Sequence, residues 1–173
     1  PVAGRFQHGQ GACGAHPGGL FFFLHQPVEE QIADDDDDET AEQAEQETGG
    51  TVVIEGRARR PYTGRVQALK RCIGNLMENA VKYGQRARVI VDDNDTRLEL
   101  RIEDEGPGIP PGELEKVFEP FYRVEASRNR DSGGTGLGLA IARSAAELHG
   151  GRIVLANRTA GGLEARLTLP RAA

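Results

Sequence analysis

Two asparagines and a lysine follow one another at helical spacing near the middle of the chain. Asn75 and Asn79 are one helical turn apart in the stretch VQALKRCIGNLMENAVKY, and Lys82 follows on the next turn. Carboxamide oxygens are neutral ligands for a hard cation, and a lysine ammonium is a point charge for phosphate. Tyr83 ends the stretch, where its ring could cover a base. The spacing is suited to a magnesium–nucleotide complex.

These side chains share a face only if the stretch Val66–Tyr83 forms an amphipathic helix. At roughly 100° per residue the polar residues fall in one narrow arc. The opposite arc is apolar and holds Val66, Leu69, Ile73, Leu76, Met77 and Ala80. An ordinary surface helix with its polar face toward water would show the same pattern. The glycine-rich motifs downstream favour the first interpretation.

The motif DEGPGIP at Asp104–Pro110 directly follows a predicted strand. A carboxylate at a strand end can accept a hydrogen bond from an exocyclic amine such as that of adenine. Gly106 and Gly108 would let a base approach the main chain. An ordinary turn has the same composition, so the motif by itself leaves both interpretations open.

The motif GGTGLGLAIA at Gly133–Ala142 opens a second predicted helix with a cluster of glycines. The N–H groups at a helix N-terminus form an anion site, so the motif predicts a phosphate cradle. It is neither a P-loop nor a dinucleotide fingerprint, because no Gly-Lys-Ser/Thr follows and the glycines are more tightly clustered. A flexible lid hinge is a compatible alternative.

The predicted elements come in segregated runs of strands and helices. Strands are expected at 51–55, 88–92, 97–104, 153–156 and 163–169. Helices are expected at 66–83, at 113–118 and at 137–148, the last stopped by Gly150 and Gly151. Such a sequence predicts an α+β sandwich of two layers, with a mixed sheet and helices on one face.

Charge divides the chain into two parts. Residues 1–47 contain one basic and eleven acidic residues, whereas residues 48–173 contain twenty basic and sixteen acidic ones. We expect residues 1–49 to be an atypical, poorly ordered acidic segment and residues 50–173 to be the folded domain. The histidines of the first part, His8, His16 and His25, lack ligand partners at metal spacing. The scattered positive charges of the second part make nucleic acid a poor partner.

Composition also bears on the compartment. Two cysteines form no disulfide framework, and the longest aromatic cluster, Leu20–Leu24, is far too short to span a bilayer. No secretory signal is recognisable. We expect a cytoplasmic protein, or the cytoplasmic part of a membrane-bound sensor, that makes no membrane contact itself.

Four motifs, in this order and spacing, resemble a known family. NLMENAVKYG, DEGPGIP, VFEPFYR and GGTGLGLAIA are similar to the N, G1, F and G2 boxes of the ATP-binding catalytic domain of bacterial sensor histidine kinases. The resemblance covers about residues 50–170 and includes the HGG at His149–Gly151. It implies the Bergerat-type ATP-binding fold that these kinases share with gyrase, a mismatch-repair protein and a heat-shock chaperone.

The resemblance implies roles residue by residue. Asn79 would be the Mg²⁺ ligand, with Asn75 and Lys82 beside the phosphates, Tyr83 over the adenine and Asp104 on its amino group. Gly106 and Gly108 would line the base pocket. The phosphate cradle and lid hinge would be formed by Gly134, Thr135, Gly136, Leu137 and Gly138. A lid arginine would contact the γ-phosphate; the candidates are Arg123, Arg128 and Arg130, and we choose Arg128.

Three nearby side chains are expected to have structural roles. We expect Phe118 and Phe121 of the VFEPFYR motif to be core residues that pack the base of the lid. His149 stands beside a helix-ending glycine pair, and packing is expected to be its role in preference to catalysis.

The implied activity is transfer of the γ-phosphoryl group of ATP to a histidine on a dimerisation domain, with a response regulator as the later partner. No acceptor sequence of the His-Glu/Asp-x-x-x-Pro type precedes Gly50, so we expect only the catalytic part here. A gyrase-type ATP-driven clamp is an alternative, but it needs a carboxylate where this chain has Asn75. A nucleotide-sensing module that acts by binding alone is the other.

Overall fold

The described part of the chain folds into one sheet covered by helices. A computed structural model describes residues 51–124 and 134–171. Its strands are β1 (Thr51–Gly56), β2 (Arg86–Asp93), β3 (Arg97–Asp104), β4 (Arg152–Asn157) and β5 (Leu163–Pro170). Its helices are α3 (Val66–Gly84), the 3₁₀ turns η1 (Pro111–Glu113) and η2 (Lys116–Phe118), and α4 (Gly138–Leu148). Every strand and long helix expected from the sequence is present, with ends that differ by a few residues.

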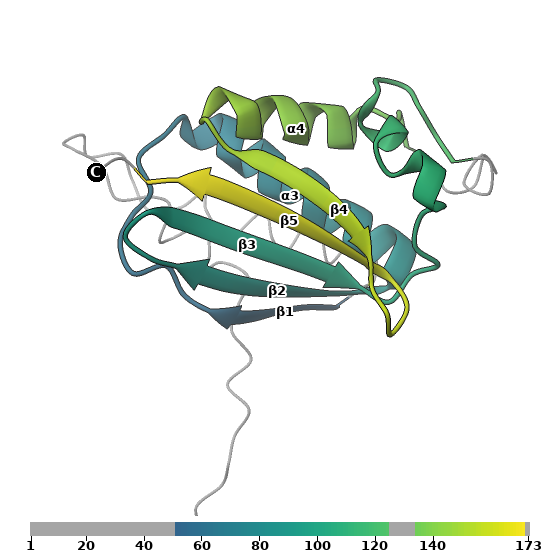
Figure 1. Cartoon of the computed structure of the whole chain (residues 1–173), viewed down its shortest axis with the longest axis horizontal. Helices are drawn as coiled ribbons and strands as arrows, with labels where there is room; N and C mark the ends of the chain where they lie inside the picture. The colour runs from purple at the N-terminus through teal and green to yellow at the C-terminus, as the bar shows by residue number, and fades with distance from the viewer. Residues whose placement is uncertain (1–50, 125–133, 172–173) are drawn as a thin grey trace, which may run out of the picture.

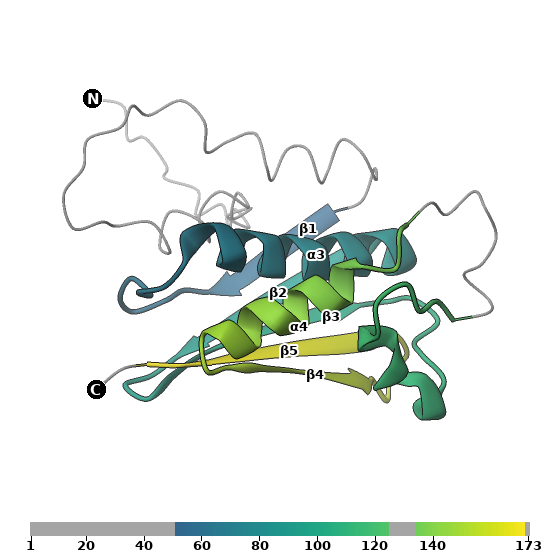
Figure 2. The ribbon, with the colours of Figure 1, turned by 90° about the horizontal axis from the view of Figure 1, so that it is seen from above.

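The sheet is mixed and has the strand order β1-β2-β3-β5-β4 (Figure 1). β1 pairs with β2 in parallel, whereas the other neighbouring pairs are antiparallel. Helices α3 and α4 run side by side over one face, as the two views together show (Figure 2). The predicted two-layer α+β sandwich, with helices on one face of a mixed sheet, is therefore confirmed.

Alternation along the strands decides which face the helices cover. In β2 the side chains of Ala87, Val89 and Val91 are buried, and the residues between them are wholly or partly exposed. β3 repeats the pattern with Leu98, Leu100 and Ile102. Because side chains on a strand alternate between the faces, the apolar set lies under the helices and the charged set lies on the uncovered face.

Helix α3 supplies the other half of the core. Its buried residues are Leu69, Cys72, Ile73, Leu76, Met77, Ala80 and Val81. The predicted apolar arc is confirmed, except that Val66 is only partly buried at the helix start. The helix ends at Gln85, whose backbone is left-handed with φ of 60° and whose N–H donates to the Val81 carbonyl. This C-cap turns the chain directly into β2.

Helix α4 matches its prediction, and the shorter helix differs. Gly150 adopts φ of 67° just after α4 and donates its N–H to the Glu147 carbonyl, as expected for a terminating glycine. The helix predicted at 113–118 is instead the two separate turns η1 and η2. The stretch lies between Pro111 and Pro120, which leaves too few residues to propagate an α-helix after its unfavourable first turn.

Some expectations fall outside the described residues. These are the poor order of residues 1–49 and the histidines there, most of the polar loop at 124–134, and the residues Arg128, Arg130 and Gly133 within it. Within residues 51–124 and 134–171, no helix is both long and apolar enough to cross a membrane.

Candidate functional site

The polar face of α3 meets the first residue of α4. A Cβ added to Gly138 would lie 3.3 Å from the Asn75 Oδ1 atom and 3.7 Å from the Asn79 Nδ2 atom. Two sequence motifs that are 60 residues apart, the carboxamide pair and the predicted phosphate cradle, are thus brought together. No side chain in the described part of the chain caps the α4 N-terminus, whose first N–H groups have no acceptor within the helix. The juxtaposition supports a phosphate site at this end of α4.

The carboxylate of Asp104 is buried at the end of β3, with 6% of the residue exposed. Its Oδ1 atom accepts the backbone N–H groups of Gly106 at 2.8 Å and Leu163 at 3.1 Å. Burial raises the pKa of Asp104, and the two N–H groups and the charge of Arg158 only partly oppose this. No described residue donates a hydrogen bond to Oδ2, which leaves that oxygen available to a ligand amine.

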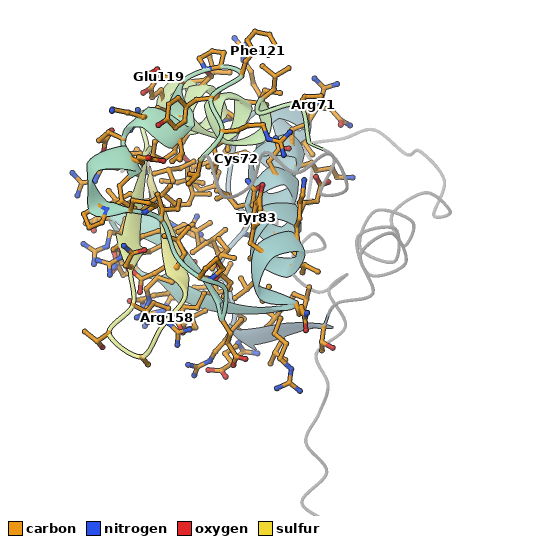
Figure 3. The ribbon with its side chains drawn as sticks, turned by 90° about the vertical axis from the view of Figure 1, so that its right-hand side faces the viewer. Arg71, Cys72, Tyr83, Glu119, Phe121 and Arg158 are labelled. Atoms are coloured by element: carbon orange, nitrogen blue, oxygen red, sulfur yellow. The ribbon has the colours of Figure 1, made fainter. Side chains whose placement is uncertain are left out.

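The C-terminal end of α3 packs directly on the Asp104 loop. A Cβ on Gly84 would lie 2.7 Å from the Asp104 Cβ, and a Cβ on Gly106 would lie 2.7 Å from the Tyr83 carbonyl oxygen. Only glycine fits either position. The contact brings Tyr83, which is 42% exposed (Figure 3), beside the motif that carries Asp104. The predicted base-covering residue and the predicted base-binding residue therefore belong to two segments that pack against each other.

Lys82 lies on the same helix end and interacts with the positive charge of Arg123. Its Nζ atom is 5.5 Å from the centroid of the Tyr83 ring. Burial and the neighbouring charge of Arg123 both lower the pKa of Lys82, and Glu78 opposes them. The predicted phosphate contact of Lys82 stays a prediction.

The glycines of the two motifs have packing reasons of their own. Gly136 has φ of 71°, and its carbonyl accepts the Phe121 N–H at 2.9 Å. Gly108 has φ of 72°, and a Cβ there would lie 2.5 Å from the Asn157 Oδ1 atom. Gly134 and Thr135 are exposed and Leu137 is half-buried at the start of α4. The roles in the base pocket and the phosphate cradle stay predictions.

Of the two phenylalanines expected in the core, one is not there. Phe118 is buried, with the Arg143 guanidinium 3.7 Å from its ring centroid, as predicted. Phe121 is 72% exposed and stands at the outside of the molecule (Figure 3), so its predicted core role is wrong. Its backbone has φ of 66°, a conformation that turns the ring outward while the main chain packs against Gly136.

His149 and Cys72 have structural surroundings. The Nε2 atom of His149 accepts the Arg65 N–H at 2.9 Å, and its Nδ1 atom donates to the Ala145 carbonyl at 2.7 Å. The imidazole therefore joins the start of α3 to the end of α4, which confirms the predicted packing role. The Cys72 thiol donates to the Ala142 carbonyl, and burial raises its pKa to about 12.

Sequence reasoning missed the turn between β4 and β5. The side chain of Asn157 holds the Asp104 loop by accepting the Ile109 N–H at 2.9 Å and donating to the Ile109 carbonyl at 2.6 Å. Arg158 donates to the Asp104 carbonyl at 2.7 Å. A lone Asn-Arg pair before a glycine-rich turn carries no signal of such a role, because the contacts span about 50 residues of sequence.

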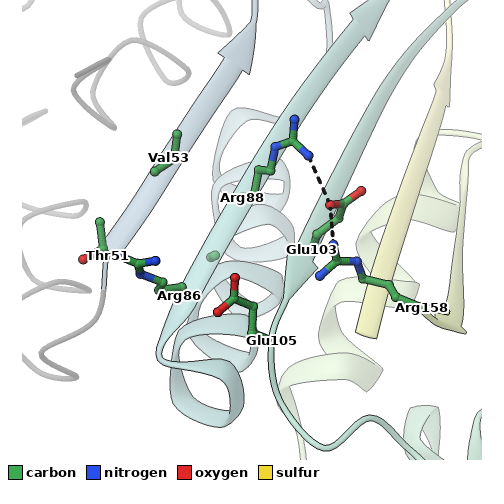
Figure 4. A pocket seen from close by; sticks show the side chains of 8 residues that line it. Thr51, Val53, Arg86, Arg88, Glu103, Glu105 and Arg158 are labelled. Atoms are coloured by element: carbon green, nitrogen blue, oxygen red, sulfur yellow. Dashed lines mark ion pairs between the residues drawn. The ribbon is translucent and has the colours of Figure 1, made fainter. Parts of the chain in front are cut away.

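A separate cavity of about 250 Å³ opens on the uncovered face of the sheet (Figure 4). None of the predicted site residues lines it. Its walls are formed by Thr51, Val53, Arg86, Ala87, Arg88, Glu103, Glu105 and Arg158. In the described part of the chain no group of three or more histidine, cysteine or acidic residues could hold a metal ion.

A family-wide comparison agrees with the geometry. The family described as histidine kinase-, DNA gyrase B-, and HSP90-like ATPase matches residues 64–173. The chain belongs to this family. As a histidine kinase-like ATPase domain it is expected to bind ATP. The predicted site residues lie on α3 and on the segments that pack against it, Asp104 at Gly84 and Gly138 at Asn75 and Asn79.

Individual relatives are sensor histidine kinases. The sensor histidine kinase GtrS of Pseudomonas aeruginosa is 49% identical over 122 residues, which cover 70% of this chain and 25% of that protein. BaeS of Escherichia coli is 41% identical over 105 residues, covering 59% and 22%. This chain therefore spans about a quarter of the length of these relatives.

Solved structures show the same architecture. A mycobacterial sensor histidine kinase, MprB, is 30% identical, with a TM-score of 0.65 and coverage of 78% of this chain and 92% of that chain. The catalytic domain of the histidine kinase ThkA in a nucleotide-free form is 24% identical, with a TM-score of 0.60 and coverage of 76% and 87%. The second likeness concerns the fold alone. The expected resemblance to histidine kinase catalytic domains is confirmed.

Proposed function

We propose that this ATPase domain binds ATP with Mg²⁺ and transfers the γ-phosphoryl group to a histidine on a separate dimerisation domain. The supporting observation is that groups suited to a base and groups suited to phosphates lie along one face of α3. The buried carboxylate of Asp104 packs at the helix C-terminal end, and the carboxamides face Gly138 further along. The rise of about 1.5 Å per residue separates Asn79 from Tyr83 by roughly 6 Å along the axis.

The base end would be recognised by hydrogen bonding. The Oδ2 atom of Asp104 would accept a hydrogen bond from the adenine amino group, and the Tyr83 ring would cover the base. Guanine has a carbonyl oxygen in place of that amine, so an ionised carboxylate there would repel it. Asp104 lies in poorly solvated surroundings, because only 6% of the residue is exposed, and this burial raises the pKa of its carboxylate. A hydrogen bond in such surroundings discriminates strongly.

The phosphate end would be held by neutral and positive groups. The donor set fits Mg²⁺, because Asn79 offers one carboxamide and the ion usually takes its remaining ligands from phosphates and water. When bound, the ion would neutralise charge on the transferring group. Lys82 and the uncapped α4 N-terminus would orient the phosphates, with Arg128 as the proposed lid cation. Positioning and charge neutralisation are the main means by which phosphoryl transfer is catalysed.

The partners would follow from the relatives. Sensor histidine kinases pass the phosphoryl group from ATP to a histidine and then to a response regulator, and we propose both as partners of this domain. Because ATP and response regulators occur in the cytoplasm, we propose that the domain acts there.

Calorimetry with ATP and GTP tests the base end of the site. Asp104→Ala should weaken ATP binding and remove most of the preference for ATP, by about tenfold or more. Asp92→Ala is the matched control, because Asp92 is an exposed aspartate on the neighbouring strand. Unchanged selectivity in Asp104→Ala would show that the carboxylate does not read the base.

Magnesium dependence tests the phosphate end. Asn79→Ala should remove the gain in ATP affinity that Mg²⁺ brings, and it should leave the melting temperature of the nucleotide-free domain close to that of the parent. Gln67→Ala, which deletes an exposed carboxamide on the same helix, should change neither. A much lower melting temperature for Asn79→Ala without nucleotide would instead assign Asn79 a structural role.

Incubation with labelled ATP tests the reaction. We expect acid-labile phosphate on a histidine-bearing dimerisation domain supplied in trans, and none on this chain alone. Release of phosphate without transfer to any such domain would favour a clamp-type ATPase. Binding with neither outcome would favour a nucleotide-sensing module.

A further inference from the structure

The turn between β4 and β5 holds Asp104 by both its main chain and its carboxylate. The Nη1 atom of Arg158 donates to the Asp104 carbonyl oxygen at 2.7 Å. The Nη2 atom of the same guanidinium lies 3.3 Å from the Glu103 Oε2 atom. Figure 4 shows Arg158 reaching across the uncovered face of the sheet to Glu103. One arginine thus contacts two consecutive residues at the end of β3.

On the side of β5, the end of β3 lies beyond the regular ladder, although Asp104 still pairs with Ala87 of β2. The register between β3 and β5 ends at the pair Glu103 and Glu164, one residue before Asp104. Beyond that pair, the turn supplies the contacts. The Leu163 N–H binds the Asp104 carboxylate. Gly162 lies so close to the Asp104 carbonyl oxygen that any side chain there would collide with it.

Arg158 is itself held by its ion pair with Glu103 on the uncovered face of the sheet. The side chain of Glu103 is only 11% exposed, and its Oε2 atom has no hydrogen-bond partner in the described residues. It is held instead between two guanidinium groups, those of Arg158 at 3.3 Å and Arg88 at 3.6 Å. A mostly covered carboxylate that faces a half-buried arginine restricts the rotamers of both. The donor to Asp104 is therefore already oriented before any ligand binds.

We propose that Arg158 is a positioning residue for base recognition, which acts by fixing the backbone and hence the carboxylate of Asp104. This inference rests on the proposed role of Asp104 in binding adenine. Loss of the Arg158 hydrogen bond would let the Asp104 carbonyl and the adjoining loop shift, while the Oδ1 contacts with Gly106 and Leu163 pull the carboxylate along. The free Oδ2 atom would then no longer be held where an adenine amine meets it.

The test measures the dissociation constants for ATP and GTP by calorimetry in five proteins: the parent, Arg158→Ala, Arg158→Lys, Arg88→Ala and Asp104→Asn. We expect Arg158→Ala to lose about tenfold of the preference for ATP over GTP, the loss typical of one charge-assisted hydrogen bond. Arg158→Lys should recover part of it, because an ammonium can still reach the Asp104 carbonyl. Arg88→Ala is the matched control and should change the preference by less than about twofold, since Arg88 contacts Glu103 but not Asp104.

The ratio of the dissociation constants for GTP and ATP separates positioning from a general structural role, because partial unfolding would weaken the binding of both nucleotides alike. If Arg158→Ala does not fold, Arg158→Lys still tests the proposal, since it should then show a ratio between those of the parent and Asp104→Asn. An unchanged ratio in the folded Arg158 variants, together with a collapsed ratio in Asp104→Asn, would overturn the positioning role and leave the base-binding role of Asp104 standing. An unchanged ratio in Asp104→Asn would overturn the role of Asp104 and the inference with it.

Discussion

Two buried aspartates stand at opposite ends of the hairpin formed by β2 and β3. Asp93 is the last residue of β2 and pairs with Leu98, whereas Asp104 is the last residue of β3 and pairs with Ala87. They are 7% and 6% exposed, so burial alone does not distinguish them. What distinguishes them is the number of partners that each carboxylate has.

Both carboxylate oxygens of Asp93 are satisfied by the protein. Arg171 donates to Oδ1 and to Oδ2 at 2.6 Å each, and the Arg59 N–H also reaches Oδ2 at 2.6 Å. Burial by itself would raise the pKa of Asp93, but these hydrogen bonds outweigh it and hold the pKa below its ordinary value. Arg171 also donates to the carbonyls of Arg60 and Pro61, so the ion pair ties the last strand to the loop before α3.

Among the described residues, hydrogen-bond donors reach only one carboxylate oxygen of Asp104, and burial raises its pKa. The comparison teaches that a buried carboxylate with a complete set of donors belongs to the scaffold. One with an open oxygen and an unfavourable environment marks a place where a ligand completes the set.

The largest effect is expected from breaking the Asp93 ion pair. Arg171→Ala leaves a buried carboxylate without its cation, so we expect it to lower the free energy of unfolding by about 3 kcal/mol or more. Urea unfolding at neutral pH measures this. Where the variant remains folded, its preference for ATP over GTP should match that of the parent. A stable Arg171→Ala would show that the backbone N–H groups alone satisfy Asp93.

The pH dependence of stability tests the same ion pair between Asp93 and Arg171. The folded pKa of Asp93 lies below the ordinary value of 3.8, so its stabilisation is complete above about pH 4 and is lost as the pH falls toward the folded pKa. We expect the parent to lose stability in that acidic window more steeply than Arg171→Ala does. Unfolding midpoints at a series of pH values below 5 provide the measurement, and parallel curves would contradict the assignment.

Asp104→Asn is expected to affect stability and ATP affinity in the opposite way from Arg171→Ala. A neutral carboxamide removes the cost of burying a charge, so the free energy of unfolding at pH 7 should stay the same or rise. ATP affinity should fall by about tenfold or more because the acceptor for the adenine amine is weakened. The matched variant Asp93→Asn should instead lose stability and keep ATP affinity. Similar profiles for the two variants would remove the distinction between scaffold and site.

A smaller effect is expected on the pH dependence of binding. The adenine amine would bind the ionised form of Asp104, and its pKa is raised. ATP affinity should therefore fall as the pH drops through that raised pKa, by up to about tenfold per pH unit below it. Titration of ATP itself contributes equally to the parent and to Asp104→Asn, so the difference between their pH profiles isolates the aspartate. Superimposable profiles would mean that the carboxylate does not change its protonation on binding.

The smallest effect is expected at an exposed ion pair of similar geometry. Arg88 binds both oxygens of Glu55 at 2.9 Å and 2.7 Å, yet the side chains are 51% and 47% exposed. Water competes for both groups, so Glu55→Ala, which breaks this pair and leaves the contact of Arg88 with Glu103 in place, should produce no resolvable change in the urea midpoint. A loss comparable to that of Arg171→Ala would show that burial is not what separates the two pairs.

Much of this molecule could be predicted from short-range patterns. The period of α3, the alternation of β3 and the helix-ending glycines at 150 and 151 are local features, because each follows from the conformations and burial of neighbouring residues. The four motifs identified the family, and the order of elements indicated a mixed sheet with helices on one face. The exposure of Phe121 was missed because it depends on a backbone conformation with positive φ, which phenylalanine rarely adopts.

The sequence by itself determined which side chains were available for nucleotide chemistry: two carboxamides and a lysine on one helix face, a carboxylate at a strand end, and glycines before a second helix. Only the tertiary structure decided which aspartate is free to bind. Asp93 and Asp104 both end strands, and the sequence does not show which partners each carboxylate meets. Arg171 binds the carboxylate of Asp93. Leu163 binds one carboxylate oxygen of Asp104, and Arg158 binds the Asp104 carbonyl. Those partners lie 54 or more residues away, and their approach depends on how β5 and its turn join the sheet.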